Sequence, residues 1–140
     1  MKLAIIGGAG VRVPLLVNGL VRSRLPITDI ALYDTDRERL EAIAGLAARF
    51  AGRARLVSAP TVAETVEGAD YVFVSIRVGG IEGRARDEAI ALRHGIVGQE
   101  TVGPGGFAMA LRTIPALVGY AREVARLAAP AGGVNFSNPA

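Results

Sequence analysis

The stretch from Lys2 to Gly10, KLAIIGGAG, decides the fold. A short apolar run ends there in a glycine turn, and an apolar pattern that opens at Pro14 then predicts a helix. Proline loses nothing in a first helical turn, because its missing N–H would have had no partner inside the helix. A strand, a glycine turn and a helix N-terminus in succession are typical of a dinucleotide site. Glycines let the backbone approach a pyrophosphate, and the helix end supplies positive charge.

A carboxylate at the end of the second apolar run strengthens this prediction. Residues 30–34 read IALYD, and Asp34 stands at about the spacing of an acid that binds the adenosine ribose hydroxyls. Since an Asp would repel a 2′-phosphate, the pattern favours NAD over NADP. The alternative is a glycine turn without a ligand, in which Asp34 only caps the next helix, although Thr35 and Asp36 are better placed for that role.

Length and composition indicate one globular domain. The chain has 140 residues, of which 51% are hydrophobic and 21% charged. The net charge of +3 comes almost entirely from arginines spread along the chain, and aromatic residues make up only 5%, so no nucleic-acid partner is expected. No apolar run is long enough to span a membrane, no signal-peptide pattern opens the chain, and there are no cysteines. We therefore expect a cytoplasmic protein without a membrane partner.

Strand and helix patterns alternate along the chain. This alternation predicts an α/β fold, with a Rossmann-like, doubly wound and mainly parallel sheet. Residues 71–75, the most strongly apolar run, suit a central strand covered on both faces. The remaining strands are expected at residues 2–6, 29–33, 55–58 and 134–139. Helices are expected at residues 13–23, 35–50, 61–66 and 107–127, the last with a kink at Pro115.

The segment from Ile76 to Gly106 interrupts this alternation and is predicted to be a long glycine-rich loop. It starts at the carboxyl edge of the sheet, where open α/β sheets bind ligands. Its arginines can fork onto a phosphate or a carboxylate. The alternative is a solvated helix on which Arg84 and Arg86 pair with neighbouring acids, namely Glu82, Asp87 and Glu88.

Six stretches together carry a resemblance to a known family. They are Ile5–Gly8, Leu32–Asp34, Arg77–Gly80, Gly98–Ala108, Leu111–Pro115 and Asn135–Ala140. They are similar to glycoside hydrolase family 4, the NAD- and manganese-dependent family of 6-phospho-glucosidases and α-galactosidases. The resemblance covers the whole chain. Its most specific part is Gly98–Ala108, which lactate and malate dehydrogenases lack, whereas they share the fold and the Asn138-Pro139 end.

The resemblance implies a 6-phospho-β-glucosidase-like enzyme that breaks an O-glycosidic bond by redox elimination. Hydride passes from C3 of the sugar to NAD, a tyrosine base takes the C2 proton, and the C1 group leaves. Water is then added and the hydride returns. This sequence is chemically sound, because a C3 ketone acidifies the C2 proton and manganese stabilises the enediolate. The implied partner is a phosphorylated glycoside, and the full-length protein is expected to be a homo-oligomer.

The resemblance also implies roles for particular residues. By motif position, Arg84 and Asn138 contact the sugar phosphate, and Glu100 lies near the tyrosine base and raises its basicity. The expected cofactor-binding residues are Gly7, Gly8, Ala9, Gly10, Val11, Asp34 and Arg77. One departure is the pair Ala9-Gly10, where many members have Gly-Ser; it removes a hydroxyl contact to phosphate.

The family's metal ligands and its tyrosine base follow the Asn-Pro segment, so no metal ligand is expected within residues 1–140. We therefore expect residues 1–140 to be the NAD-binding domain of a larger enzyme, inactive without its catalytic C-terminal part. Three alternatives stay open: a relative that acts on α-galactosides or α-glucosides, a 2-hydroxy acid dehydrogenase, and a stand-alone NAD-binding module.

Overall fold

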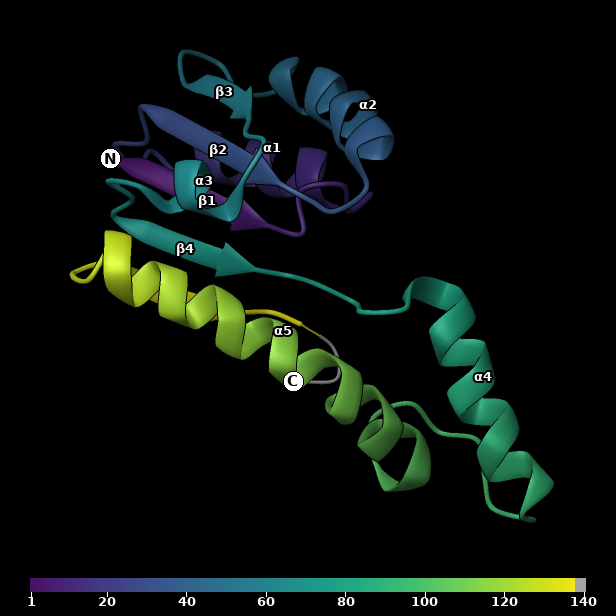
Figure 1. The fold of residues 1–140 in the computed structure, drawn as a ribbon. Coiled ribbons are helices and arrows are strands. Elements are labelled where there is room, and N and C mark those ends of the chain that lie inside the picture. Colours follow the sequence, from purple (N-terminus) through teal and green to yellow (C-terminus); the bar gives the residue numbers. More distant parts are fainter. Residues whose placement is uncertain (138–140) are drawn as a thin grey trace.

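The computed structural model describes residues 1–137 and has an α/β architecture (Figure 1). Its five strands form one sheet in the order β3-β2-β1-β4-β5, and every pair of neighbours is parallel. The strands are β1 (Lys2–Ile6), β2 (Asp29–Tyr33), β3 (Arg55–Ser58), β4 (Tyr71–Val74) and β5 (Gly132–Asn135). The helices are α1 (Val13–Arg22), α2 (Arg37–Ala48), α3 (Val62–Val66), α4 (Gly80–Arg93) and α5 (Gly103–Leu127). The predicted fold class is confirmed.

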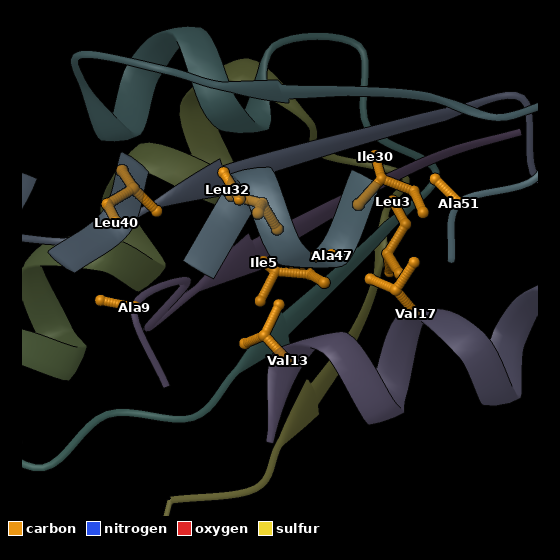
Figure 2. Close-up of a cluster of buried hydrophobic side chains, with 11 residues drawn as sticks. Leu3, Ile5, Ala9, Val13, Val17, Ile30, Leu32, Leu40, Ala47 and Ala51 are labelled. Atoms are coloured by element: carbon orange, nitrogen blue, oxygen red, sulfur yellow. The ribbon is translucent and has the colours of Figure 1, made fainter. Parts of the chain in front are cut away.

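Two apolar clusters cover the two faces of the sheet. Alternate side chains of β1 enter different clusters, because successive residues of a strand point to opposite faces. Leu3 and Ile5 pack with α1 and α2 on one face (Figure 2), and Ala4 and Ile6 pack with α3 and the C-terminal half of α5 on the other. Burial of each large aliphatic side chain contributes about 1.5–3 kcal/mol. The central strand β1 is therefore held from both sides.

The strand predicted to be central is less buried than its sequence indicates. β4 lies inside the sheet, between β1 and β5, but Tyr71 is 48% exposed and Phe73 is only partly buried. β1 occupies the middle of the sheet instead. The outer neighbour of β4 is β5, which lies at the edge of the sheet and is itself largely exposed, so this side of the sheet is covered less completely.

The segment predicted to be one long loop contains the helix α4. Residues 84–93 are mostly alanine, leucine, glutamate and arginine, which favour helix, and Gly79 and Gly80 adopt positive φ angles at the helix start. α5 begins four residues earlier than predicted, at Gly103, and continues through Pro115 without interruption. β5 begins two residues earlier than predicted and ends at Asn135.

α4 packs against the N-terminal half of α5, away from the strands, and an extended link joins it to β4 (Figure 1). The carboxyl end of the sheet is therefore bordered by this helix pair. Among the helices of residues 1–137, none combines the length and the apolarity that a membrane crossing requires.

Candidate functional site

A cavity of about 560 Å³ opens at the carboxyl ends of β1, β2 and β4. It lies where the strand order reverses, with β2 and β3 on one side of β1 and β4 and β5 on the other. Open α/β sheets bind ligands at such a switch point. The turns after the three strands and the middle of α5 supply its walls, through Gly7, Ala9, Gly10, Asp34, Arg77, Gly79 and Tyr120 among others.

The glycine turn after β1 is held by the next strand. The N–H groups of Gly7 and Gly8 both donate to the Tyr33 carbonyl oxygen, at 2.9 and 2.8 Å. Gly7 has a φ of +97°, and a Cβ there would collide with the Ser75 carbonyl group. A Cβ on Gly8 would lie 2.9 Å from the Leu32 Cβ. These two glycines therefore allow close packing against β2 and β4, and their amides serve the fold rather than a ligand.

The amides that stay available for a ligand come slightly later in the chain. Gly10 N–H donates to the Gly7 carbonyl at 3.2 Å, and Val13 N–H donates to the Gly10 carbonyl at 2.9 Å. Within the described residues, the N–H groups of Val11 and Arg12 have no hydrogen-bond partner. They lie at the N-terminus of α1, where the helix dipole favours an anion.

The Asp34 carboxylate borders the cavity at the end of β2. Its Oδ2 accepts the Ala9 N–H at 3.0 Å, and its Oδ1 accepts the Asp36 N–H at 3.2 Å. The cap of α2 is Asp36, which accepts the Arg39 N–H at 3.0 Å, so the alternative role of Asp34 as that helix cap is wrong. A carboxylate has about four acceptor positions, so Asp34 retains capacity for a hydroxyl donor from a ligand.

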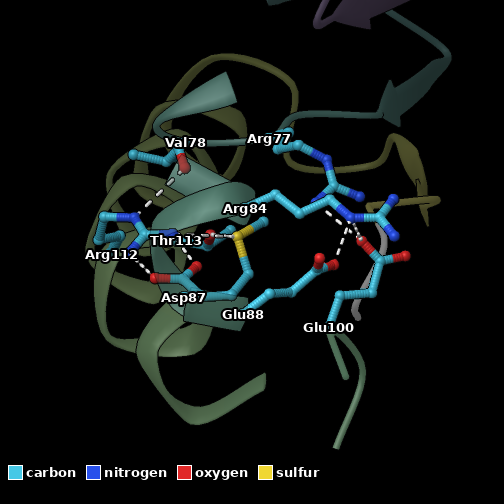
Figure 3. A network of polar contacts seen from close by, with 9 residues as sticks. Arg77, Val78, Arg84, Asp87, Glu88, Glu100, Arg112 and Thr113 are labelled. Carbon is cyan, nitrogen blue, oxygen red and sulfur yellow. Dashed lines mark hydrogen bonds and ion pairs between the residues drawn. The ribbon is translucent and has the colours of Figure 1, made fainter. Parts of the chain in front are cut away.

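Three of the predicted polar residues come together beside the cavity (Figure 3). Glu100 Oε2 lies 3.1 Å from Arg77 Nη1 and 3.1 Å from Arg84 Nε, although no hydrogen bond from residues 1–137 is directed at this buried oxygen. Arg84 Nε also donates to Glu88 Oε1 at 2.7 Å, one helical turn away. That hydrogen bond, with the charge of Glu100, raises the pKa of Arg84. Of the alternative pairings along α4, the one between Arg84 and Glu88 is thus present, together with a link from Arg84 to Glu100, whereas Asp87 pairs with Arg112 of α5.

Tight glycine packing places Glu100 at this position. A Cβ on Gly105 would collide with the Gln99 carbonyl, and one on Gly106 would collide with the Thr101 carbonyl. The glycines of the most family-specific stretch therefore let the segment that carries Glu100 lie directly on the first turn of α5.

A partly buried ion pair between α4 and α5 was not expected from the sequence. Arg112 donates to both carboxylate oxygens of Asp87, from Nη1 at 2.8 Å and from Nη2 at 2.5 Å. Asp87 is only 5% exposed. The hydrogen bonds from Arg112 lower the pKa of Asp87 against the opposing effect of burial. The one signal in the sequence was the charge of Arg112 beside the buried residues Met109 and Thr113 of α5, because a charge in that position needs a partner.

Two tyrosines face each other in the cavity wall. The rings of Tyr33 and Tyr120 meet edge to face, with centroids 6.3 Å apart. Burial, and then the neighbouring Tyr33 and Asp34, raise the pKa of Tyr120. Tyr120 therefore stays protonated at neutral pH, which is the opposite of what a general base requires.

Two further predictions concern the second substrate contact and the metal ligands. Asn138, the second predicted substrate contact, lies outside the described residues. Among residues 1–137 there is no group of three or more histidine, cysteine, aspartate or glutamate side chains that could hold a metal ion.

Comparisons with known proteins agree with this geometry. The model of the family 4 glycosyl hydrolases matches residues 2–140. The 6-phospho-beta-glucosidase BglT of Thermotoga maritima is 37% identical over 99% of this chain and 34% of its own length. The 6-phospho-alpha-glucosidase 1 of Lacticaseibacillus paracasei is 35% identical over 97% of this chain and 32% of its own length. The chain thus spans about a third of the length of these relatives.

Solved structures of similar enzymes have nearly the same fold as this chain. A 6-phospho-beta glucosidase from Thermotoga maritima, solved with manganese, NAD+ and glucose-6-phosphate, has a TM-score of 0.94 at 37% identity. It covers 99% of this chain, which corresponds to 35% of that structure. A 6-phospho-alpha-glucosidase from gut microorganisms, in complex with NAD and Mn²⁺, has a TM-score of 0.92 at 29% identity over 99% of this chain and 33% of its own.

Proposed function

The chain belongs to family 4 of the glycosyl hydrolases, and from this membership we propose that residues 1–140 form the NAD-binding part of a 6-phospho-β-glucosidase-like enzyme. The observation that carries the proposal is the Asp34 carboxylate beside the glycine turn, at the edge of the cavity. The comparisons favour this function over a 2-hydroxy acid dehydrogenase. Two relatives named for β-glucosides are 37% and 36% identical, a 6-phospho-alpha-glucosidase is 35% identical, and a third β-glucosidase is 34% identical, so the two highest of these values support β-glucosides by a small margin.

The residues of the cavity fit NAD. The free amides of Val11 and Arg12, at the N-terminus of α1, would hold the pyrophosphate. Asp34 would accept the ribose hydroxyls. Gly7, Gly8, Ala9 and Gly10 would shape the turn that the dinucleotide crosses, and Arg77 would border its far end. When bound, NAD accepts and returns a hydride.

The ionic cluster beside the cavity suits a phosphorylated sugar. Arg84 keeps 43% of its side chain exposed, so its guanidinium can meet an incoming phosphate as well as Glu88 and Glu100. We assign Arg84 to the sugar phosphate, together with Asn138. Glu100 is assigned to the tyrosine base, which would lie outside residues 1–140. A nearby negative charge disfavours the phenolate and so raises the basicity of that tyrosine.

Residues 1–137 do not fit the manganese ion that the solved relatives contain, because they offer no cluster of ligands for it. The metal would therefore be held by other parts of the full-length enzyme, and we assign no step to it here. Residues 1–140 alone are expected to bind NAD and to turn over nothing.

We place the full-length enzyme in the cytoplasm, as a homo-oligomer. NAD and sugar phosphates are charged and cross membranes only at high cost, so an enzyme that uses both works where both are retained. α5 carries an exposed apolar stripe, which gives further protein a surface to cover. Its members are Phe107, Leu111, Ile114 and Val118.

A comparison of the full-length enzyme with the fragment tests the proposal. The full-length enzyme should release nitrophenol from 4-nitrophenyl 6-phospho-β-glucoside only when both NAD and manganese are present. The fragment should release none, yet bind NAD in a calorimetric titration. Faster cleavage of the α-anomer would transfer the assignment to α-glucosides. NADH formation from malate or lactate would replace it with a dehydrogenase, and NAD binding without any hydrolysis would indicate a binding module.

A further inference from the structure

We propose that Arg112, held by Asp87, is a positioning residue for the cofactor cavity: it fixes the turn of residues 78–80, which forms one wall. The inference rests on the proposed function, because it assigns this cavity to NAD. Arg112 itself does not line the cavity, so it would act through the backbone that it holds.

The first step is the geometry of the ion pair. Two parallel hydrogen bonds join the guanidinium of Arg112 to the carboxylate of Asp87, which leaves neither group free to rotate (Figure 3). The pair links the third turn of α4 to the third turn of α5. Because Asp87 is almost fully buried, removal of the Arg112 guanidinium would leave the Asp87 carboxylate as an unpaired charge that solvent cannot reach.

The second step is the contact between the same guanidinium and the turn. Arg112 Nε donates to the Val78 carbonyl at 3.4 Å. A Cβ on Gly79 would lie 3.2 Å from Arg112 Nε, and one on Gly83 would lie 3.3 Å from Nη2. Two glycines therefore leave just enough room for the guanidinium to rest against the backbone of the turn and of α4.

The third step connects this turn to the cavity. Val78, Gly79 and Gly80 all line the cavity, and Arg77 precedes them. An extended link joins β4 to α4, and α4 packs on α5 instead of on the sheet (Figure 1). The position of this wall therefore depends on how α4 is attached to α5, and Arg112 joins α4, α5 and the turn at one point.

The experiment compares Arg112→Lys with Arg126→Gln in the chain as it stands. Lysine keeps the positive charge for Asp87 but cannot form two parallel hydrogen bonds and reach Val78 as well. Arg126 forms a salt bridge with Glu123 on the last turn of the same helix, where both side chains are exposed, so its loss controls for removal of an ion pair from α5. The readouts are NAD titration, denaturant unfolding and amide hydrogen exchange at Gly80 and Gly83. These two amides bond to Arg77 and Gly79 and so report on the turn.

In Arg112→Lys we expect the wall of residues 78–80 to be correctly placed in about a tenth of the molecules. NAD should then bind about tenfold more weakly, because apparent affinity falls by the fraction of molecules that can bind. Exchange at Gly80 and Gly83 should accelerate, while Arg126→Gln should match the wild type in both readouts. Unchanged NAD affinity together with unchanged exchange in Arg112→Lys would overturn the inference. Weaker NAD binding without faster exchange would also overturn it, because the effect would then not pass through the turn.

Two further outcomes remain decisive. If the wild-type chain binds no NAD, the proposed function fails for this chain, and the exchange at Gly80 and Gly83 still decides whether Arg112 fixes the turn. If Arg112→Lys does not fold, Gly83→Ala replaces it. This change keeps every charge and favours the helix, but crowds Nη2 of Arg112. Faster exchange at Gly80 then supports the inference, and unchanged exchange contradicts it.

Discussion

Replacement of Asp34 by asparagine is the sharpest test of the cofactor site, because it removes a charge and preserves the shape of the side chain. The Asp34 carboxylate accepts two backbone N–H groups, from Ala9 at 3.0 Å and from Asp36 at 3.2 Å. Asparagine keeps one acceptor oxygen and places an NH₂ group where the other was. One of the two amides therefore loses its partner, and the free energy of unfolding should fall by about 1–3 kcal/mol.

The effect on cofactor binding follows from the same geometry. A hydrogen bond from a ribose hydroxyl to a charged acceptor is worth about 1.5–3 kcal/mol, so NAD should bind Asp34→Asn about ten- to a hundredfold more weakly. For NADP, two unit charges about 4 Å apart repel by about 4 kcal/mol at an effective dielectric constant of about 20. Since about 1.4 kcal/mol corresponds to a tenfold change in affinity, this repulsion predicts that the wild type prefers NAD over NADP by two to three orders of magnitude. The variant should lose most of that preference.

Calorimetric titration of both cofactors measures these effects. The variants are Asp34→Asn and Asp34→Ala, and Asp36→Asn is the matched control, since it alters a neighbouring carboxylate that caps α2. Denaturant unfolding of each variant separates lost stability from lost affinity. Equal affinity of the wild type for NAD and NADP would refute the role of Asp34, and so would an undiminished preference for NAD in Asp34→Asn.

Three further predictions follow from single residues. Gly7→Ala should lower the free energy of unfolding in urea by about 2–4 kcal/mol, because φ is +97° and the new Cβ would strike a carbonyl, whereas Gly19→Ala, with open space around it, should not. Because Arg112 lowers the pKa of Asp87, the stability from this pair is complete above the unfolded pKa of about 3.9 and is lost as pH falls through the lower folded pKa; urea unfolding at pH 2–7 should show a shallower acid loss in Asp87→Asn. Ultraviolet titration should show a tyrosine that ionises above about pH 10 and is missing from Tyr120→Phe, and loss of a transition at or below about pH 10 in that variant would contradict the raised pKa.

Local sequence patterns predicted the parts of the fold that depend on neighbours in the chain. The apolar run of β1, the glycine turn and Asp34 after β2 all lie where their spacing placed them. The helix α4 was harder to recognise, because Gly79, Gly80 and Gly83 lie at its start and glycine disfavours helix. In the folded chain Gly83 leaves room for Arg112, a reason that exists only after α5 has docked.

The polar contacts of the site divide in the same way. The sequence indicated that Arg77, Arg84 and Glu100 belong to one region, and they meet there. It did not indicate that Arg112 pairs with Asp87, because 25 residues separate them and no periodic pattern links two helices. Nor did it reveal that the amides of Gly7 and Gly8 are taken up by the backbone, since this depends on the register of β1 against β2.

The carbonyl of Tyr33 accepts hydrogen bonds from two successive amides, and this shapes the thermodynamics of ligand capture. The loop between β1 and α1 is fastened to its neighbouring strand before any nucleotide arrives, so little backbone entropy remains to be lost on association. Free and liganded forms of this loop should then superimpose closely, and the heat of binding should report mostly on contacts and displaced water.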